Sequence, residues 1–147
     1  MNEELRIFGA PSRYIQGAGA ISLLGEVLKE FSNECFIVAD AFVLSLYKEE
    51  IDRNCALTGV SVSFGQFGGE CTYDEINNMS LRAKDAGVIV GLGGGKAIDT
   101  AKGVSLKFGL PIVIVPTIAS NDSPTSRLVV VYNEGHAIVG VDKMPKN

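Results

Sequence analysis

Apolar and polar positions along the chain follow two periods, which alternate from one segment to the next. Short runs that are apolar throughout or at every second position are typical of strands, and they lie at 35–39, 60–64, 88–90 and 112–115. Longer stretches with apolar residues three and four positions apart predict helices over 20–31, over 42–51, from 72 to about 86 and over 95–108. This order of strands and helices predicts an α/β fold with a mostly parallel sheet flanked by helices.

Further alternating segments frame this pattern. Residues 13–17 alternate like a short strand, and the segments 128–132 and 137–141 flank the turn-forming residues 133–136. The second arrangement predicts a C-terminal β-hairpin appended to the sheet. A chain of 147 residues is about one domain, so we expect a single domain over 1–147.

Composition and charge narrow the class of protein. The chain is 46% hydrophobic and 20% charged, which is typical of a globular domain. A formal net charge of −4 without a basic block argues against nucleic acid as a partner. There is no apolar run long enough to span a membrane and no signal-peptide pattern, and the widely spaced Cys35, Cys55 and Cys71 are typical of reduced thiols. We therefore expect no membrane partner and a cytoplasmic protein.

The richest candidate chemistry lies at 91–100, where an apolar strand runs into three glycines, 93–95, and then into a helix with Lys96 in its first turn. Glycines at a strand-to-helix turn let a bulky anion approach the backbone, and free N–H groups at the start of a helix favour phosphate. The segment matches neither G-x-G-x-x-G nor the Walker A pattern, because Lys96 takes the last glycine position of the first and is followed by Ala97. We expect a nucleotide pyrophosphate site; the alternative is a tight turn that merely needs glycine.

A second polar loop, 116–126, directly follows the strand expected at 112–115. The hydroxyls of Thr117 and Ser120 can hydrogen-bond a phosphate, an amide or a ribose, and Asp122 can accept from a polyol hydroxyl. In a parallel sheet this loop lies beside the glycine turn, because both leave the carboxyl ends of neighbouring strands, where ligands gather. The alternative is an ordinary turn rich in Ser, Asn, Asp and Pro.

Together the two loops resemble the iron-containing (metal-dependent, group III) alcohol dehydrogenase family, and within it the glycerol dehydrogenase branch. The family pattern Gly-Gly-Gly-Lys/Ser-x-x-Asp-x-x-Lys is matched at 93–102. The branch pattern Pro-Thr-Ile-Ala-Ser-Thr-Asp-Ala-Pro is matched at 116–124, with Asn121 and Ser123 as departures, and the opening at 11–17 is similar as well. The resemblance covers essentially the whole chain, and it implies that this single domain is a Rossmann-like, NAD-binding N-terminal domain.

By this resemblance, roles in binding NAD are implied residue by residue. Gly94, Gly95 and Lys96 match the pyrophosphate site. Asp40 matches the acidic residue that holds the adenosine ribose, and its charge disfavours a 2′-phosphate, so that NAD is implied over NADP. Further cofactor contacts are implied at Thr117, Ser120, Ser126, Leu128 and Tyr132.

On the substrate side, Asp122 matches the aspartate that contacts the polyol, whereas Arg127 stands where these enzymes usually carry a small residue. The family's catalytic zinc, or other divalent metal, is implied to be held by one Asp and two His in a helical C-terminal domain beyond this chain. The only histidine, His136, is expected to be a solvated turn residue, and one His cannot build a three-ligand site. We therefore expect no complete catalytic set and no metal site here, as in a truncated product, an expressed domain or a fragment.

The resemblance implies that the complete enzyme oxidises glycerol to dihydroxyacetone and passes hydride to NAD, and that the isolated chain is inactive. Two alternatives stay open. One is another polyol or alcohol dehydrogenase of the same superfamily, or a member of its dehydroquinate-synthase-like group. The other is a non-catalytic nucleotide-binding or interaction module, in which apolar surface that once faced a second domain would favour self-association.

Overall fold

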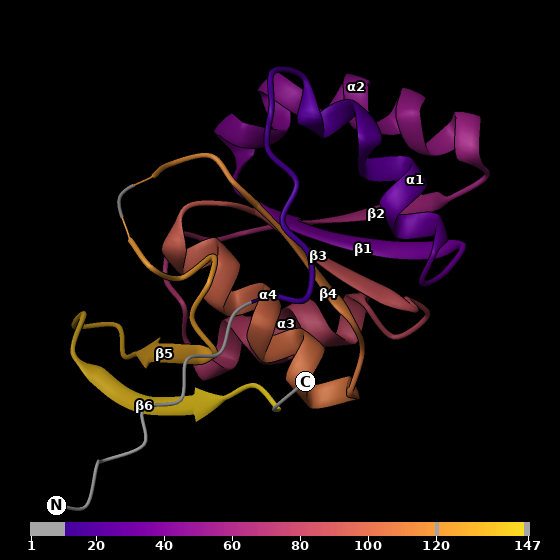
Figure 1. Cartoon of the computed structure of the whole chain (residues 1–147). Coiled ribbons are helices and arrows are strands. Elements are labelled where there is room, and N and C mark those ends of the chain that lie inside the picture. Colours follow the sequence, from indigo (N-terminus) through magenta and orange to yellow (C-terminus); the bar gives the residue numbers. More distant parts are fainter. Residues whose placement is uncertain (1–10, 120, 146–147) are drawn as a thin grey trace, which may run out of the picture.

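Four parallel strands form the central sheet of the computed structural model, which describes residues 11–119 and 121–145. The strands lie in the order β2-β1-β3-β4 (Figure 1) and are β1 (Glu34–Ala39), β2 (Ser61–Gln66), β3 (Val88–Gly93) and β4 (Ile112–Pro116). The predicted α/β fold with a parallel, Rossmann-like sheet is confirmed. In this order the chain changes direction across the sheet between β1 and β3, which is where open parallel sheets place their ligand crevice.

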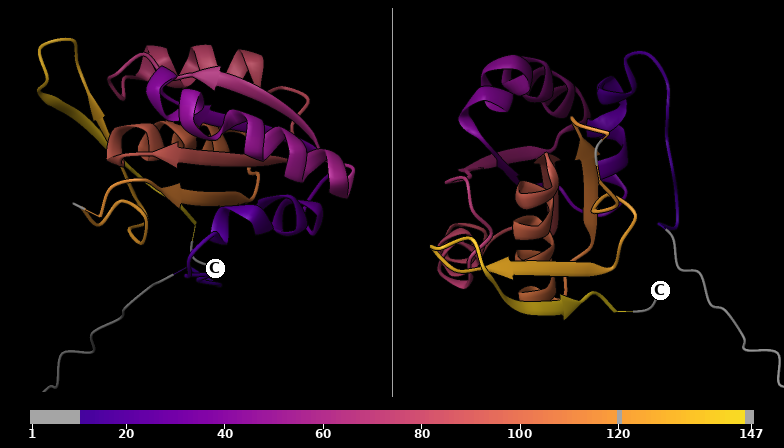
Figure 2. Two further views of the ribbon diagram at one scale, coloured as in Figure 1. Left: turned by 90° about the horizontal axis from the view of Figure 1, so that it is seen from above. Right: turned by 90° about the vertical axis from the view of Figure 1, so that its left-hand side faces the viewer.

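Helices cover both faces of the sheet (Figures 1 and 2). One layer holds the 3-10 turn η1 (Ala20–Leu23), α1 (Leu24–Lys29) and α2 (Ala41–Thr58), and the other holds α3 (Tyr73–Arg82) and α4 (Gly95–Phe108). Side chains of β1 alternate between the layers, so that Ile37 packs with α1 and α2 while Phe36 and Val38 pack with α3 and α4. Because both faces are covered, β3 is buried along its whole length.

The helices differ in length from the sequence expectation. The helix predicted to end at 51 continues to Thr58, because Ile51 and Cys55 lie one turn apart on its inner face and are fully buried. Its charged stretch at 48–50 faces outward, and the helix ends at Gly59, whose backbone is left-handed at φ 73°. The helix that begins after Thr72 ends at Arg82, earlier than predicted.

The strand predicted at 13–17 is wrong, because this segment is irregular and exposed. Alternation would bury either Tyr14 or Ile15, yet their side chains are 73% and 43% exposed and no described strand pairs with them. The helix predicted over 20–31 is divided into η1 and α1. No helix within the described ranges is both long and apolar enough to cross a membrane.

The predicted C-terminal hairpin forms from β5 (Leu128–Tyr132) and β6 (Ile138–Lys143), but it is not appended to the sheet. It is a separate two-stranded antiparallel sheet that lies across α4 (Figure 2). Val129 and Val131 are fully buried in the same cluster as the inner face of α4. Packing against a helix therefore replaces pairing with a strand, and it places the hairpin beside the start of α4.

Candidate functional site

Two loops meet at the carboxyl ends of β3 and β4. In the parallel register Gly93 lies opposite Pro116, and the amide of Thr117 donates a 3.0 Å hydrogen bond to the carbonyl of Gly93. The glycine turn and the loop that begins at Thr117 therefore leave the sheet side by side. This is the arrangement expected from the order of the strands along the chain.

Two glycines of this turn have separate structural roles. Gly93 has a φ of 147°, a backbone conformation that residues with a side chain rarely adopt. Gly95 provides space, because a Cβ added there would lie 2.8 Å from the Asn121 side-chain nitrogen. The turn thus combines an unusual backbone conformation with a close approach of the second loop.

The start of α4 differs from the starts of α2 and α3. The Asp40 carboxylate accepts from the amide of Val43 at 2.8 Å, and the Thr72 hydroxyl accepts from the amide of Glu75 at 3.0 Å, so both helices are capped by side chains. The N-cap of α4 is Gly94, which offers no side-chain cap. A Cβ built on Gly94 would make only an ordinary van der Waals contact, at 3.6 Å from Ile118. This geometry fits an anionic group such as a pyrophosphate.

Asp40 brings a carboxylate to the same place from β1. One oxygen caps α2, and the other lies 3.9 Å from the position that a Cβ on Gly93 would take. Asp40 and Gly93 thus flank the point between β1 and β3 where the strand order reverses. A half-buried carboxylate in this position can accept hydrogen bonds from the hydroxyls of a ribose.

Lys96 has partners within the protein. Its ammonium donates a 2.7 Å hydrogen bond to Glu70 Oε2 and lies 5.1 Å from the centre of the Tyr132 ring. Glu70, in the loop between β2 and α3, also contacts His136 Nδ1 at 2.6 Å. Sequence reasoning did not single out Glu70. His136 is an exposed turn residue, as expected, but it is paired with a carboxylate rather than only solvated.

A buried polar network holds the second loop and the hairpin on α4. Lys102 Nζ lies 3.1 Å from Asp99 Oδ1 and 3.3 Å from Ser123 Oγ, and it donates to the Leu128 carbonyl at 3.0 Å. Asp99 also accepts from Ser123 Oγ at 2.6 Å and from the amide of Val130 at 3.1 Å. Both charges are buried, yet each is hydrogen-bonded several times, as burial requires. Sequence reasoning had quoted Asp99 and Lys102 only as motif positions and Ser123 as a departure.

The remaining predicted residues lie around the same edge. Thr117 and Asp122 are exposed, and Ser126 Oγ accepts from the amide of Leu128 at 3.0 Å, at the beginning of β5. Ser120 lies outside the described residues. Arg127, the other departure, donates to the carbonyl of Met144 through Nε at 3.1 Å and through Nη2. Its side chain therefore closes the base of the hairpin.

The cysteines lack the properties of nucleophiles. Cys35, Cys55 and Cys71 are free and buried. Burial raises the pKa of the Cys71 thiol to about 11 and that of Cys35 further still. As predicted, they act as reduced, buried thiols.

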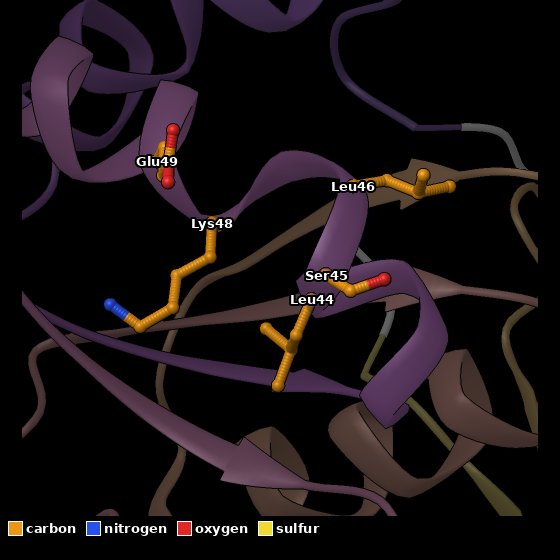
Figure 3. A pocket seen from close by; sticks show the side chains of 5 residues that line it. All are labelled: Leu44, Ser45, Leu46, Lys48 and Glu49. Atoms are coloured by element: carbon orange, nitrogen blue, oxygen red, sulfur yellow. The ribbon is translucent and has the colours of Figure 1, made fainter.

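Among residues 11–119 and 121–145, this edge of the sheet holds no cluster of metal ligands. Within the described ranges, no three of His, Cys, Asp and Glu lie close enough together to hold a metal ion. A shallow hollow lies along α2, and Figure 3 shows its lining side chains, which all come from that one helix and point apart: Leu44, Ser45, Leu46, Lys48 and Glu49. Polar groups do not converge there, so the loops at the ends of β1, β3 and β4 are the candidate site.

The sequence of the chain matches the family described as iron-containing alcohol dehydrogenase over residues 11–146, and the chain belongs to this family. Such a family implies a dinucleotide and a metal cofactor. The described residues fit the dinucleotide, through the uncapped start of α4 and Asp40, but do not by themselves fit the metal.

Within this family, the chain is similar to several glycerol dehydrogenases. The chain is 44% identical over 140 residues to a glycerol dehydrogenase of Thermotoga maritima, covering 93% of this chain and 38% of that protein. It is 42% identical over 131 residues to a glycerol dehydrogenase of Escherichia coli O6:H1, covering 88% and 36%. The crystal structure of glycerol dehydrogenase from Schizosaccharomyces pombe superimposes with a TM-score of 0.87 at 31% identity, over 99% of this chain and 37% of that one. The chain thus spans less than two fifths of the length of each.

Proposed function

We propose that residues 1–147 form the dinucleotide-binding domain of an NAD-dependent glycerol dehydrogenase. The observation that carries the proposal is the start of α4, which lacks a side-chain cap and lies between Asp40 and the second loop. Uncapped helix amides attract phosphate, and the neighbouring carboxylate suits the ribose of a dinucleotide. The 42% and 44% identity to glycerol dehydrogenases supports the same choice of enzyme.

In this proposal the cofactor lies across the carboxyl ends of β1, β3 and β4. Gly94 and Gly95 present backbone amides to the pyrophosphate, Lys96 adds a positive charge, and Asp40 accepts from the adenosine ribose. The nicotinamide half extends towards the second loop and the hairpin, with contacts from Thr117, Ser120, Ser126, Leu128 and Tyr132.

Asp122 is the proposed contact to substrate. Its side chain is exposed at the tip of the second loop, and a carboxylate there can accept hydrogen bonds from vicinal hydroxyls of a polyol. In the complete enzyme the secondary alcohol of glycerol loses hydride to the nicotinamide and a proton from its hydroxyl, which yields dihydroxyacetone. The family's metal supplies the polarisation of the alcohol oxygen. The described residues supply cofactor and substrate binding to this reaction.

A titration of the chain with NADH tests the cofactor site. We expect saturable binding, weakened several-fold by Lys96→Met, because the ammonium is one of several phosphate contacts. Lys84→Met is the matched control, since Lys84 is exposed in the turn after α3 and loses the same charge. A folded chain without measurable affinity for NADH would contradict the proposal.

Discrimination between NADH and NADPH tests the role of Asp40. Asn caps helices as well as Asp does, so Asp40→Asn keeps the start of α2 while removing the negative charge. We expect the wild-type chain to prefer NADH, and Asp40→Asn to reduce that preference by weakening repulsion of the 2′-phosphate. An unchanged ratio of the two Kd values would remove Asp40 from the ribose site.

The substrate is tested with the protein extended to the length of its relatives. Higher activity on a long-chain primary alcohol than on glycerol would favour another branch of the superfamily.

Self-association of the isolated chain is a further prediction, and light scattering at high protein concentration tests it.

A further inference from the structure

Three segments that are distant in the sequence meet at one carboxylate oxygen. Oε2 of Glu70, in the loop between β2 and α3, accepts from Lys96 Nζ at 2.7 Å and lies 2.6 Å from His136 Nδ1. Its other oxygen accepts from the amide of Cys71 at 3.2 Å. The loop, the first turn of α4 and the turn of the hairpin are therefore joined through Glu70.

Glu70 is ionised in this arrangement. Its side chain is only 16% exposed, and burial by itself would raise the pKa of the carboxyl. Hydrogen bonds from Lys96, His136 and the amide of Cys71 outweigh burial and hold the pKa below its usual range. A negative charge thus lies at hydrogen-bond distance from the lysine that follows the glycine turn.

The charge of Lys96 is accordingly compensated from within the protein. Its ammonium is bonded to Glu70 and lies over the Tyr132 ring, on the hairpin side of α4. Pyrophosphate at the start of α4 would need the same ammonium and would be repelled by the same carboxylate. The Glu70 carboxylate and the pyrophosphate would therefore each weaken the other's contact with Lys96.

We propose that Glu70 sets the affinity of the dinucleotide site by competing with the pyrophosphate for Lys96. The inference rests on the proposed function, because the anion in question is the pyrophosphate of the cofactor. Glu70 acts through Lys96 and is a positioning residue that keeps the ammonium at the hairpin until a cofactor arrives. An enzyme that must release reduced cofactor in each cycle gains from such a competitor, because it limits how tightly the dinucleotide is held.

Glu70→Gln is the decisive variant, since Gln has nearly the same size and shape but carries no charge. Its single carbonyl oxygen can accept from Lys96 or from the Cys71 amide, but not from both. We expect NADH to bind roughly three- to tenfold more tightly, a modest factor because Lys96 is 45% exposed and such ion pairs are weak. Glu75→Gln is the matched control. It removes the same charge five residues away, from a carboxylate that accepts from the amide of Gly68 at 2.8 Å and does not contact Lys96. The control should leave the Kd unchanged.

Two further measurements separate competition from a general change of charge. ADP, which carries a pyrophosphate, should bind Glu70→Gln more tightly than wild type, whereas adenosine, which has none, should bind both equally. In a Lys96→Met background the Glu70 substitution should lose most of its effect on NADH, because competition for the ammonium is gone and only direct repulsion of the pyrophosphate remains. Mass spectrometry after mild acetylation should also show faster modification of Lys96 in Glu70→Gln than in wild type.

Unchanged or weaker NADH binding by a folded Glu70→Gln variant would overturn the inference while leaving the proposed function intact. An equal gain with adenosine, or in the Lys96→Met background, would overturn it as well. If wild type bound no measurable NADH, the proposed function would fail, and the inference that rests on it would fail with it.

Discussion

The hydroxyl of Ser123 donates a 2.6 Å hydrogen bond to Asp99 Oδ1, across an interface between the second loop and α4. Ser123 is 7% exposed and lies directly after Asp122, the proposed substrate contact. The bond therefore anchors the loop to α4 next to the exposed carboxylate of Asp122. It also gives Ser123, a departure from the glycerol dehydrogenase pattern, a physical role.

Replacing this hydroxyl should destabilise the chain. Ser123→Ala removes a donor to Asp99 and a partner of Lys102 inside a buried network, for a cost of about 1–2 kcal/mol in the free energy of unfolding. Thr125→Ala, in the same loop, removes an exposed hydroxyl that bonds to the Asp122 carbonyl at 3.2 Å and should cost less than about 0.5 kcal/mol. Urea unfolding measures both changes in the free energy of unfolding. Equal losses would show that the buried hydrogen bond contributes no more to stability than the exposed one.

Loss of the buried ammonium should cost more. Lys102 is 1% exposed, and Lys102→Met would leave the charge of Asp99 buried without its cation. Breaking a buried pair from one side costs about 3–5 kcal/mol. Lys107→Met, on the same helix, removes only an exposed bond to Asn77 and should stay within about 0.5 kcal/mol of wild type. A Lys102 variant as stable as the Lys107 variant would mean that the network contributes little.

Alanine substitutions at the neighbouring Gly94 and Gly95 should have different effects, one on NADH binding and the other on stability. Gly94 has an extended backbone that alanine adopts without strain, so Gly94→Ala should change the melting temperature by at most a few degrees. Its methyl group would face the space proposed for the pyrophosphate, and we expect at least about tenfold weaker NADH binding. Gly95→Ala should instead lower stability, because its methyl group would lie 2.8 Å from the side chain of Asn121. The opposite pattern would show that the anion lies elsewhere.

Acid should reveal the ion pairs of Glu70. Its pKa is below the usual value, so its stabilisation is fully present above about pH 4.3, the ordinary pKa of glutamate, and is lost as the pH falls through the folded value. The free energy of unfolding of wild type should therefore fall more steeply below that pH than that of Glu70→Gln. Urea titrations at several pH values measure the difference. Parallel curves would contradict an ionised, hydrogen-bonded Glu70.

Glycerol should not be oxidised by this chain, even with added zinc. The described residues contain no cluster of three His, Cys, Asp or Glu that could hold a metal ion. Hydride transfer from a neutral alcohol without a Lewis acid or a placed base lacks several kcal/mol of barrier lowering. At about 1.4 kcal/mol per tenfold change, the rate should lie below detection. NADH absorbance with glycerol and zinc is the assay. Zinc-dependent turnover abolished by Asp122→Ala would place a complete catalytic site within this chain.

The sequence by itself determined the fold class, and it predicted that the two loops of the candidate site lie together at one edge of the sheet. Strands such as 88–90 are recognisable because both faces of a parallel sheet are covered, which requires unbroken apolar runs. The glycine turn and the loop after Pro116 could be placed at one edge, because parallel strands end on the same side and β3 and β4 are neighbours.

Only the tertiary structure decided which polar side chains meet. The hairpin alternates in the same way whether it joins the sheet or lies across α4, and burial of Val129 and Val131 against that helix settles its place. Lys96 and Glu70 are 26 residues apart, and no local pattern relates them. Periodicity reports which face of an element is buried, whereas pairing of charges depends on how separate elements pack. This is why the contact between Glu70 and Lys96 emerged only from the structure.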